Sequence, residues 1–287
     1  MRDFSGNHEA LSINTATVRR QAPLDAIIEA CARRDIRMIS PWRDQVHAVG
    51  LARIAAQLRD TGITLSGYCR GGFFPAADRA GLAAALDDNR QAIDEAKTLG
   101  SPCLVLVVGS LPGALTGTPA YSDIGRARQE VFDGIAATLD HARACAMPLA
   151  IEPLHPMLAA DRACINTLEH ALDICDALDP ARSGMLGVAA DVYHIWWDAK
   201  LAAQIARAGP ERLLALHVCD WLVPTCDLLN DRGMMGDGFI ELRKIRGWME
   251  EAGYAGAAEA EIFSDRWWQR PLAEVLDICI ERHRSVV

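Results

Sequence analysis

The stretch from Cys103 to His155 decides the fold, because it contains one complete strand–helix–strand unit. It begins with "CLVLVVG" (103–109), a continuous apolar run, and ends with "LAIEPLH" (149–155). Between them, the amphipathic spacing over 122–145 predicts a helix. Strands that are apolar throughout are typical of parallel sheets with both faces covered. We therefore expect two parallel strands joined by a helical crossover.

The same unit recurs along the rest of the sequence. The predicted strands cover 11–18, 36–42, 63–69, 103–109, 149–155, 185–191, 213–218 and 257–263. The predicted helices cover 23–34, 51–60, 79–99, 122–145, 167–178, 201–208, 240–252 and 272–284. Such strand–helix pairs in 287 residues predict an α/β fold, a (β/α)8 TIM barrel that spans 1–287 as a single domain. An open doubly wound sheet usually has a glycine-rich first turn, which "NTATVRRQAP" (14–23) lacks.

Composition and charge exclude several classes of protein. The formal net charge of −9 argues against a nucleic-acid partner. No apolar run reaches the roughly 18 residues that span a bilayer, and "MRDFSGNHEALSINT" (1–15) lacks the apolar core of a secretory signal. The nine cysteines form no CxxC pair, so we expect reduced thiols. We therefore predict a cytoplasmic protein that contacts neither nucleic acid nor membrane.

Charged side chains follow four consecutive strands at the end where a barrel carries its chemistry. They are Glu152, Asp191, His217 and Glu261. Glu259 shares the face of Glu261 by the period of two and is expected to lie deeper. Three carboxylates crowded in an apolar barrel mouth repel one another and resist ionisation.

A divalent cation would remove that repulsion. A single glutamate at a strand end more often pairs with a basic residue, and a single histidine is usually structural, so the complete set of four is what favours a metal. Oxygen-rich ligation with one imidazole suits Mn²⁺, Mg²⁺ or Co²⁺ better than a structural zinc. We predict a divalent ion as cofactor, foremost Mn²⁺, with Mg²⁺, Co²⁺ or Zn²⁺ as alternatives.

Other side chains after the strand ends are candidates for substrate binding. They are His155, Asp220, Trp42, Arg70 and Arg232. Arg232 belongs to the glycine-rich segment "DRGMMGDGFIE" (231–241) and has the chemistry to bind a carboxylate or phosphate bidentately. The alternative is a surface turn in which Arg232 pairs with Asp231 or Asp237.

Four segments resemble the sugar-phosphate isomerase/epimerase superfamily, the xylose-isomerase-like barrels. They are "AIEPLHP" (150–156), "AADVYHIWWD" (189–198), "LHVCDWLVPTCDLLNDRGMMGDGFI" (216–240) and "GYAGAAEAEIFS" (253–264), and the likeness covers nearly the whole chain. Members include ketose 3-epimerases, hydroxypyruvate isomerase, inosose dehydratase and, more remotely, endonuclease IV.

This resemblance implies roles for particular residues. Glu152, Asp191, His217 and Glu261 would be the metal ligands, and Glu152 and Glu261 would also be the catalytic acid/base pair. His194 matches a histidine that contacts the substrate oxygen beside the reacting carbon. The resemblance also implies a homodimer or homotetramer.

The sequence departs from the ketose 3-epimerases at two positions. Their second glutamate, six residues after the first ligand, is Leu158 here, and their arginine, six residues after the histidine ligand, is Val223. These departures argue against a free ketohexose as substrate. His155, Arg232 and Asp237 are the candidates to replace the missing groups.

The expected function is a divalent-metal-dependent sugar isomerase or epimerase on a small-molecule sugar substrate. It would abstract a proton next to a carbonyl through a metal-stabilised enediolate. A lyase or dehydratase acting on a keto-sugar, keto-glycoside or keto-cyclitol would use the same site and is the main alternative. Endonuclease chemistry needs several more histidines than the eight present, and a non-catalytic binding barrel is disfavoured because all four ligand positions are filled.

Overall fold

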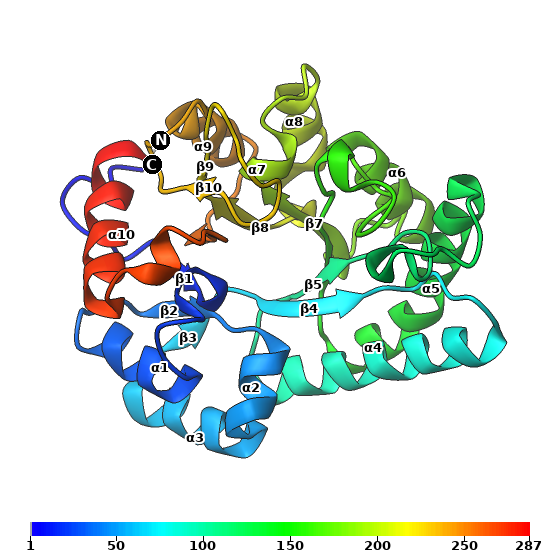
Figure 1. Ribbon diagram of the computed structural model, residues 1–287, viewed down its shortest axis with the longest axis horizontal. Helices are drawn as coiled ribbons and strands as arrows, with labels where there is room; N and C mark the ends of the chain where they lie inside the picture. The colour runs from blue at the N-terminus through cyan, green and yellow to red at the C-terminus, as the bar shows by residue number, and fades with distance from the viewer. Residues whose placement is uncertain (1) are drawn as a thin grey trace.

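Short parallel strands form the barrel in the computed structural model, which describes residues 2–287 (Figure 1). They are β1 (Leu11–Asn14), β2 (Met38–Ser40), β3 (Thr64–Leu65), β4 (Tyr68–Gly72), β5 (Leu104–Val107), β6 (Leu149–Ile151), β7 (Leu186–Asp191), β8 (Leu213–Val218) and β11 (Ala258–Ala260). Their order is β3-β2-β1-β11-β8-β7-β6-β5-β4. All pairs in this sheet are parallel, which confirms the predicted (β/α)8 barrel.

The barrel closes at the third predicted strand, which is interrupted rather than continuous over 63–69. β3 pairs with β2, while β4 pairs with β5, so the two ends of the sheet belong to one segment of chain. Across the interruption, the Ser66 amide donates to Ile39 O at 3.0 Å and the Cys69 amide donates to Pro41 O at 3.0 Å. These hydrogen bonds join the two edges into a ring.

Helices surround the strands (Figure 1). They are α1 (Leu24–Ala32), α2 (Arg43–Val49), α3 (Leu51–Thr61), α4 (Arg79–Leu99), α5 (Ile124–Cys145), α6 (Leu168–Leu178), α7 (Val192–Ile195), α8 (Leu201–Arg212), α9 (Leu242–Glu251) and α10 (Leu272–Val286). The sequence did not predict the short α2 and α7. The helix predicted over 201–208 was too short, because α8 continues past a kink at Gly209 and Pro210.

Two predicted strands end earlier than expected, and both ends matter for the site. The first was predicted over 11–18 but stops at Asn14, whose side chain accepts a hydrogen bond from the Ala16 amide at 3.0 Å and caps a 3-10 helix over Thr15–Val18. The fifth stops at Ile151. Asn14 and Glu152 are therefore placed at the barrel rim instead of inside a strand.

The segment after β8 folds into a small antiparallel hairpin that the sequence did not predict. β9 (Asp220–Trp221) pairs with β10 (Arg232–Gly233). The hairpin lies at the rim of the barrel and carries Arg232, which is buried. Thus the glycine-rich segment 231–241 delivers a charged side chain, Arg232, to the mouth.

Small side chains fill the barrel interior beneath the rim. This cluster consists of Cys69, Cys103, Val105, Ala150, Ala189 and Ala215. All nine cysteines are unpaired thiols within residues 2–287, as predicted. Among the helices of that range, not one combines the length and the apolar character needed to cross a membrane.

Candidate metal centre

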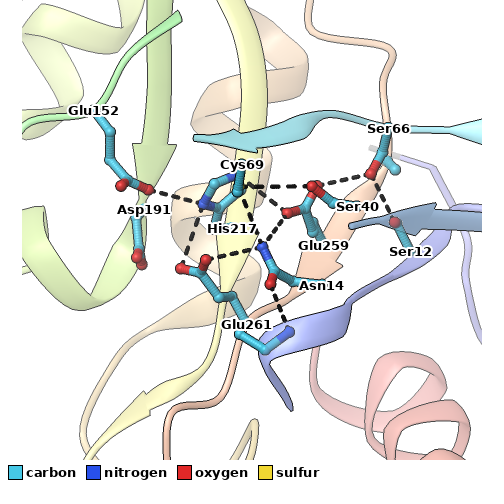
Figure 2. Close-up of polar contacts among 12 residues, drawn as sticks. Ser12, Asn14, Ser40, Ser66, Cys69, Glu152, Asp191, His217, Glu259 and Glu261 are labelled. Carbon is cyan, nitrogen blue, oxygen red and sulfur yellow. Dashed lines mark hydrogen bonds and ion pairs between the residues drawn. The ribbon is translucent and has the colours of Figure 1, made fainter. Parts of the chain in front are cut away.

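The four residues predicted as metal ligands converge at the carboxyl ends of neighbouring strands (Figure 2). Glu152 follows β6, Asp191 ends β7, His217 belongs to β8 and Glu261 follows β11. All four side chains are buried, and one potential ligand atom from each lies within 4.8 Å of the others. We refer to these four residues as the rim cluster.

The parallel register explains why they meet. Asp191 is the pairing partner of His217 on the neighbouring strand, and His217 in turn pairs with Glu259. The parallel hydrogen bonding between β8 and β11 continues for one residue past the end of β11, because the Glu261 amide donates to Val218 O at 3.0 Å. Backbone hydrogen bonding therefore fixes the rim cluster independently of its side-chain charges.

His217 lies at the centre of the charge distribution. Its Nδ1 is 3.0 Å from Glu152 Oε1 and 3.6 Å from Glu261 Oε2, while its Nε2 is 3.4 Å from Glu259 Oε1. Burial opposes the charged imidazolium, but the surrounding carboxylates, Glu259 and Glu261 foremost, raise the pKa of His217 well above its ordinary value. Its two ring nitrogens thus face different partners: the rim cluster on one side and Glu259 on the other.

The carboxylates of the rim cluster differ in their readiness to ionise. Burial raises the pKa of Glu261 to about 7, and it also raises the pKa of Glu152. Burial acts in the same direction on Asp191, but the positive charge of Arg232 outweighs it and holds the pKa of Asp191 far below its usual range. Without a bound cation, the two glutamates therefore lose their protons less readily than ordinary carboxyl groups, and His217 holds its proton more tightly than an ordinary imidazole.

The donor set fits a divalent cation. Glu152 Oε1 and His217 Nδ1 are buried and have no hydrogen-bond partner of good geometry, although they lie 3.0 Å apart. Carboxylate and imidazole ligands bind divalent ions at about 2.0–2.6 Å, so donors on opposite sides of an ion are separated by up to roughly twice that distance. The 4.8 Å limit that spans the rim cluster is compatible with this geometry.

Metal binding should release protons from this cluster. At pH 7 we expect about one or more protons to leave per Mn²⁺ bound, because ligands must be deprotonated. Since burial raises the pKa of Glu261 to about 7, binding should weaken as the pH falls through that value. Titration calorimetry in buffers of different ionisation enthalpy measures the proton count. Heats that do not depend on the buffer would contradict the prediction.

Arg232 spans two members of the rim cluster. Its Nη1 lies 2.8 Å from Asp191 Oδ2 and 3.1 Å from Glu261 Oε2, and its guanidinium stacks on the Tyr193 ring, 4.4 Å from the centroid. The alternative of a surface turn is wrong: Asp231 accepts from the Cys226 amide instead of pairing with Arg232.

Asp237, the other suggested partner, is turned away from the site. Its carboxylate pairs with Arg282 at 3.2 Å on α10. Asp237 therefore does not replace the polar groups that the ketose epimerases have at their substrate site.

His194 is an uncharged imidazole directed at the rim cluster. Its Nδ1 accepts from the His155 backbone amide at 3.1 Å. Its Nε2 is 3.5 Å from Asp191 Oδ2 and 3.1 Å from Arg232 Nη2. Burial lowers the pKa of His194 to about 3, which keeps the ring uncharged at neutral pH.

A hydrogen-bonded layer beneath the rim orients the cluster, and sequence reasoning missed most of it. Asn14 Nδ2 donates to Glu259 Oε1 at 2.7 Å and to Glu261 Oε1 at 2.8 Å, and Trp42 Nε1 donates to Asn14 Oδ1 at 2.8 Å. Ser66 Oγ donates to the other Glu259 oxygen at 2.7 Å (Figure 2). A polar asparagine at the end of an apolar strand was the signal that could have identified this layer.

Removing the charge beneath His217 should weaken metal binding. We expect Glu259→Gln to lower Mn²⁺ affinity about 10- to 100-fold, the usual effect of losing the partner of a metal-bound histidine. Calorimetric titration of the purified variant measures this, with the exposed Glu281→Gln on α10 as matched control. Affinity equal to that of the wild type would show that Glu259 does not support the ligand.

A cavity of about 360 Å³ opens above the rim cluster. Of the predicted site residues, its walls include Trp42, Arg70, Glu152, His194, Arg232 and Glu261. Leu158, at the position of the second glutamate of ketose epimerases, contributes an apolar side chain to the same wall. Val223 is 64% exposed on the loop after β9 and takes no part in the lining.

Two predicted substrate contacts, Asp220 and His155, do not line this cavity. The Asp220 carboxylate accepts hydrogen bonds from the backbone amides of Trp221, Gly236 and Ile240, so it holds the segment after β9 in place. The His155 ring stacks on Trp221 at 4.9 Å between centroids. Contrary to expectation, the structure gives Asp220 a role in loop conformation, and His155 contacts the site through the hydrogen bond from its backbone amide to His194 Nδ1.

Three kinds of comparison agree on the fold. The family model described as "Xylose isomerase-like TIM barrel" matches residues 26–282. A solved protein structure from Sinorhizobium meliloti 1021 is 56% identical with a TM-score of 0.92, covering 97% of this chain and 98% of that one. The solved IolI protein with a bound zinc atom is 18% identical with a TM-score of 0.81, over 97% of this chain and 98% of that one. Inosose isomerase of Halalkalibacterium halodurans is 21% identical over 206 residues, 71% of this chain and 68% of the relative.

Proposed function

The chain belongs to the xylose isomerase-like TIM barrel family, and we propose that it is a divalent-metal-dependent sugar isomerase or epimerase. The observation that carries this proposal is the rim cluster itself: three carboxylates and one imidazole, all buried, at the mouth of a cavity of about 360 Å³. The inosose isomerase relative and the zinc-bound IolI neighbour support a sugar substrate and a divalent ion. We propose Mn²⁺ as that ion because most of the donors are carboxylate oxygens.

We assign the successive proton transfers of the reaction to different residues. When bound, the ion supplies a Lewis acid that polarises the substrate carbonyl. Glu152 then takes the proton from the carbon beside that carbonyl, acting as general base. Glu261 returns a proton, either on the other face of the same carbon to give an epimer or to the neighbouring carbon to give an isomer. The carboxylates of both glutamates approach the same nitrogen, His217 Nδ1, at 3.0 Å and 3.6 Å.

Two side chains would hold the substrate oxygens next to the reacting carbon. Nε2 of His194 and the guanidinium of Arg232 lie beside Asp191 at the base of the cavity. Because His194 is neutral and Arg232 is charged, together they can stabilise negative charge that develops on a substrate oxygen. Trp42 and Phe263 add apolar walls against the C–H face of a sugar and limit the access of water.

A lyase or dehydratase acting on a keto-sugar, keto-glycoside or keto-cyclitol is the second candidate. It shares the proton abstraction by Glu152 and differs in losing an oxygen substituent from the next carbon. The observation that favours it is Leu158, which lines the cavity where ketose epimerases place a second glutamate. Because the site has one polar side chain fewer to bind the substrate, it is less suited to a free ketohexose.

Product identity tests the proposal. The Mn²⁺-loaded protein is incubated with a panel of ketoses, keto-glycosides and inososes, and products are identified by NMR. We expect an epimer or aldose–ketose isomer to appear only with metal present. An unsaturated or dehydrated product would assign the protein to the lyases. No metal-dependent product from any member would contradict both candidates.

We also propose that the protein is a homodimer or homotetramer. Large apolar side chains remain exposed on loops of the chain, including Met157, Val223 and Phe239, each more than 60% exposed. Aromatic residues and methionine are enriched in subunit interfaces. Light scattering coupled to gel filtration should give twice or four times the chain mass of 31.2 kDa, and a monomeric mass would contradict this proposal.

A further inference from the structure

One arginine in the cavity wall lacks a counter-charge. Four of the five arginines that line the cavity have acidic partners: Arg232 pairs with the rim cluster, Arg19 with Asp44, Arg20 with Asp265 and Arg162 with Asp161. Arg70 forms no ion pair and no side-chain hydrogen bond with any residue in the described range. Arg70 lines both this cavity and the adjoining pocket that contains Asp44 and Asp88, and in neither does its guanidinium have the paired anion that a partly buried guanidinium normally has.

Local structure holds this side chain in the wall. In the pairing of β4 with β5, Cys69 lies opposite Val105 and Gly71 opposite Leu106, so Arg70 is the extra residue of a bulge. Bulges redirect a side chain out of the regular alternation, often beside active sites. The Arg70 guanidinium also lies over the Phe73 ring, 4.0 Å from the centroid, which fixes the planar group while leaving its N–H donors free.

We propose that Arg70 binds a carboxylate group of the substrate, which makes the natural substrate a sugar acid or a carboxylated sugar derivative. This inference rests on the proposed function, because it assumes that the sugar binds in this cavity. The planar fork of a guanidinium matches a carboxylate bidentately. The substrate would thus place its carbonyl at the rim cluster and its carboxylate on β4.

The charge balance favours a carboxylate over a phosphate ester. With a divalent ion bound, that ion and Arg232 match the charge of the three carboxylates of the rim cluster, and Glu259 lies beneath them beside His217. Arg70 is then the one cavity arginine without an acidic partner, and a single guanidinium suits a monoanion. A phosphate ester carries close to two negative charges at neutral pH. No second arginine with an open partner is available to it among the cavity residues described.

Matched ligands test the assignment. Sets of a neutral sugar, the corresponding sugar acid and the corresponding phosphate ester are titrated into the metal-loaded protein, with binding read by thermal stabilisation and calorimetry. We expect a sugar acid to bind about 10- to 100-fold more tightly than its neutral counterpart, as for a charged hydrogen-bonded contact. Arg70→Met should abolish that preference, and Arg70→Lys should restore part of it. The exposed Arg59→Met serves as control and should leave the preference unchanged.

Three outcomes of the ligand titrations would contradict the proposed role of Arg70. A tighter complex with the phosphate ester, a sugar-acid preference that survives Arg70→Met, or no preference for sugar acids in any set would overturn the assignment. The preference counts only if the Arg70→Met protein melts within a few degrees of the wild type. Binding is measured without turnover, so the two proposals fail separately. Sugar-acid binding without any product contradicts the proposed function, whereas turnover without that preference contradicts the role of Arg70.

Discussion

Glu152→Gln is expected to slow product formation about 10²- to 10⁴-fold, the usual contribution of a general base. The substitution keeps the size of the side chain and one oxygen for the metal, but its amide cannot accept the substrate proton. Steady-state rates with the substrate found in the product screen measure the effect, and the exposed Glu9→Gln is the matched control. A Glu152→Gln variant with more than a tenth of the wild-type rate would remove Glu152 from the proton-transfer role.

The companion variant Glu261→Gln separates the two glutamates. If Glu152 removes the proton and Glu261 returns one on the other side, Glu261→Gln should still allow proton exchange at the reacting carbon while blocking conversion to the epimer. If Glu152→Gln and Glu261→Gln lost proton exchange at the reacting carbon to the same extent, the two glutamates would not have these separate roles. Because both residues are also proposed ligands, metal content is measured for each variant before the rates are compared.

Asp191→Asn should have the second large effect, on metal binding and stability together. Loss of the carboxylate removes a ligand and leaves Arg232 without its 2.8 Å partner in a buried position. We expect Mn²⁺ affinity to fall by more than about 100-fold, beyond the range typical of a residue that only supports a ligand. We also expect the free energy of unfolding to drop by about 3–5 kcal/mol, the cost of breaking a buried ion pair.

Calorimetry and urea unfolding measure these two quantities. Asp140→Asn is the control, since its side chain is 93% exposed and its contact with Arg143 is on the surface of α5. A stability loss without a loss of Mn²⁺ affinity would assign Asp191 to the ion pair alone and would contradict its role as a ligand.

The barrel could be predicted because short, mainly apolar strands alternate with amphipathic helices along the chain. Strand ends were less predictable. "LSINTATV" (11–18) has the composition of a strand throughout, yet Asn14 caps the following turn and ends β1 there. Local hydrogen bonding by one side chain decided that boundary, which composition does not reveal.

The rim cluster was predictable for a related reason, since parallel strands bring their carboxyl ends to one edge of the sheet. Its surroundings depended on tertiary pairing. Arg232 reaches the cluster because β9 and β10 form a hairpin, and Asp220 is occupied by backbone amides of the same segment. Neither outcome follows from the spacing of these residues along the chain. The absence of an ion-pair partner for Arg70 is likewise visible only once the cavity walls are assembled.

The measurement that tests the central claim most directly is hydrogen exchange at the substrate carbon next to the carbonyl. The protein is incubated in D₂O with its substrate, once with Mn²⁺ and once with the metal removed by a chelator, and deuterium is located by NMR. The proposed metal-dependent proton transfer predicts that deuterium enters that one carbon with Mn²⁺, that chelation stops it, and that Glu152→Gln slows it about 10²- to 10⁴-fold. Deuterium entry that is equally fast in the chelated protein, or unchanged in Glu152→Gln, would contradict the claim that the rim cluster performs this chemistry.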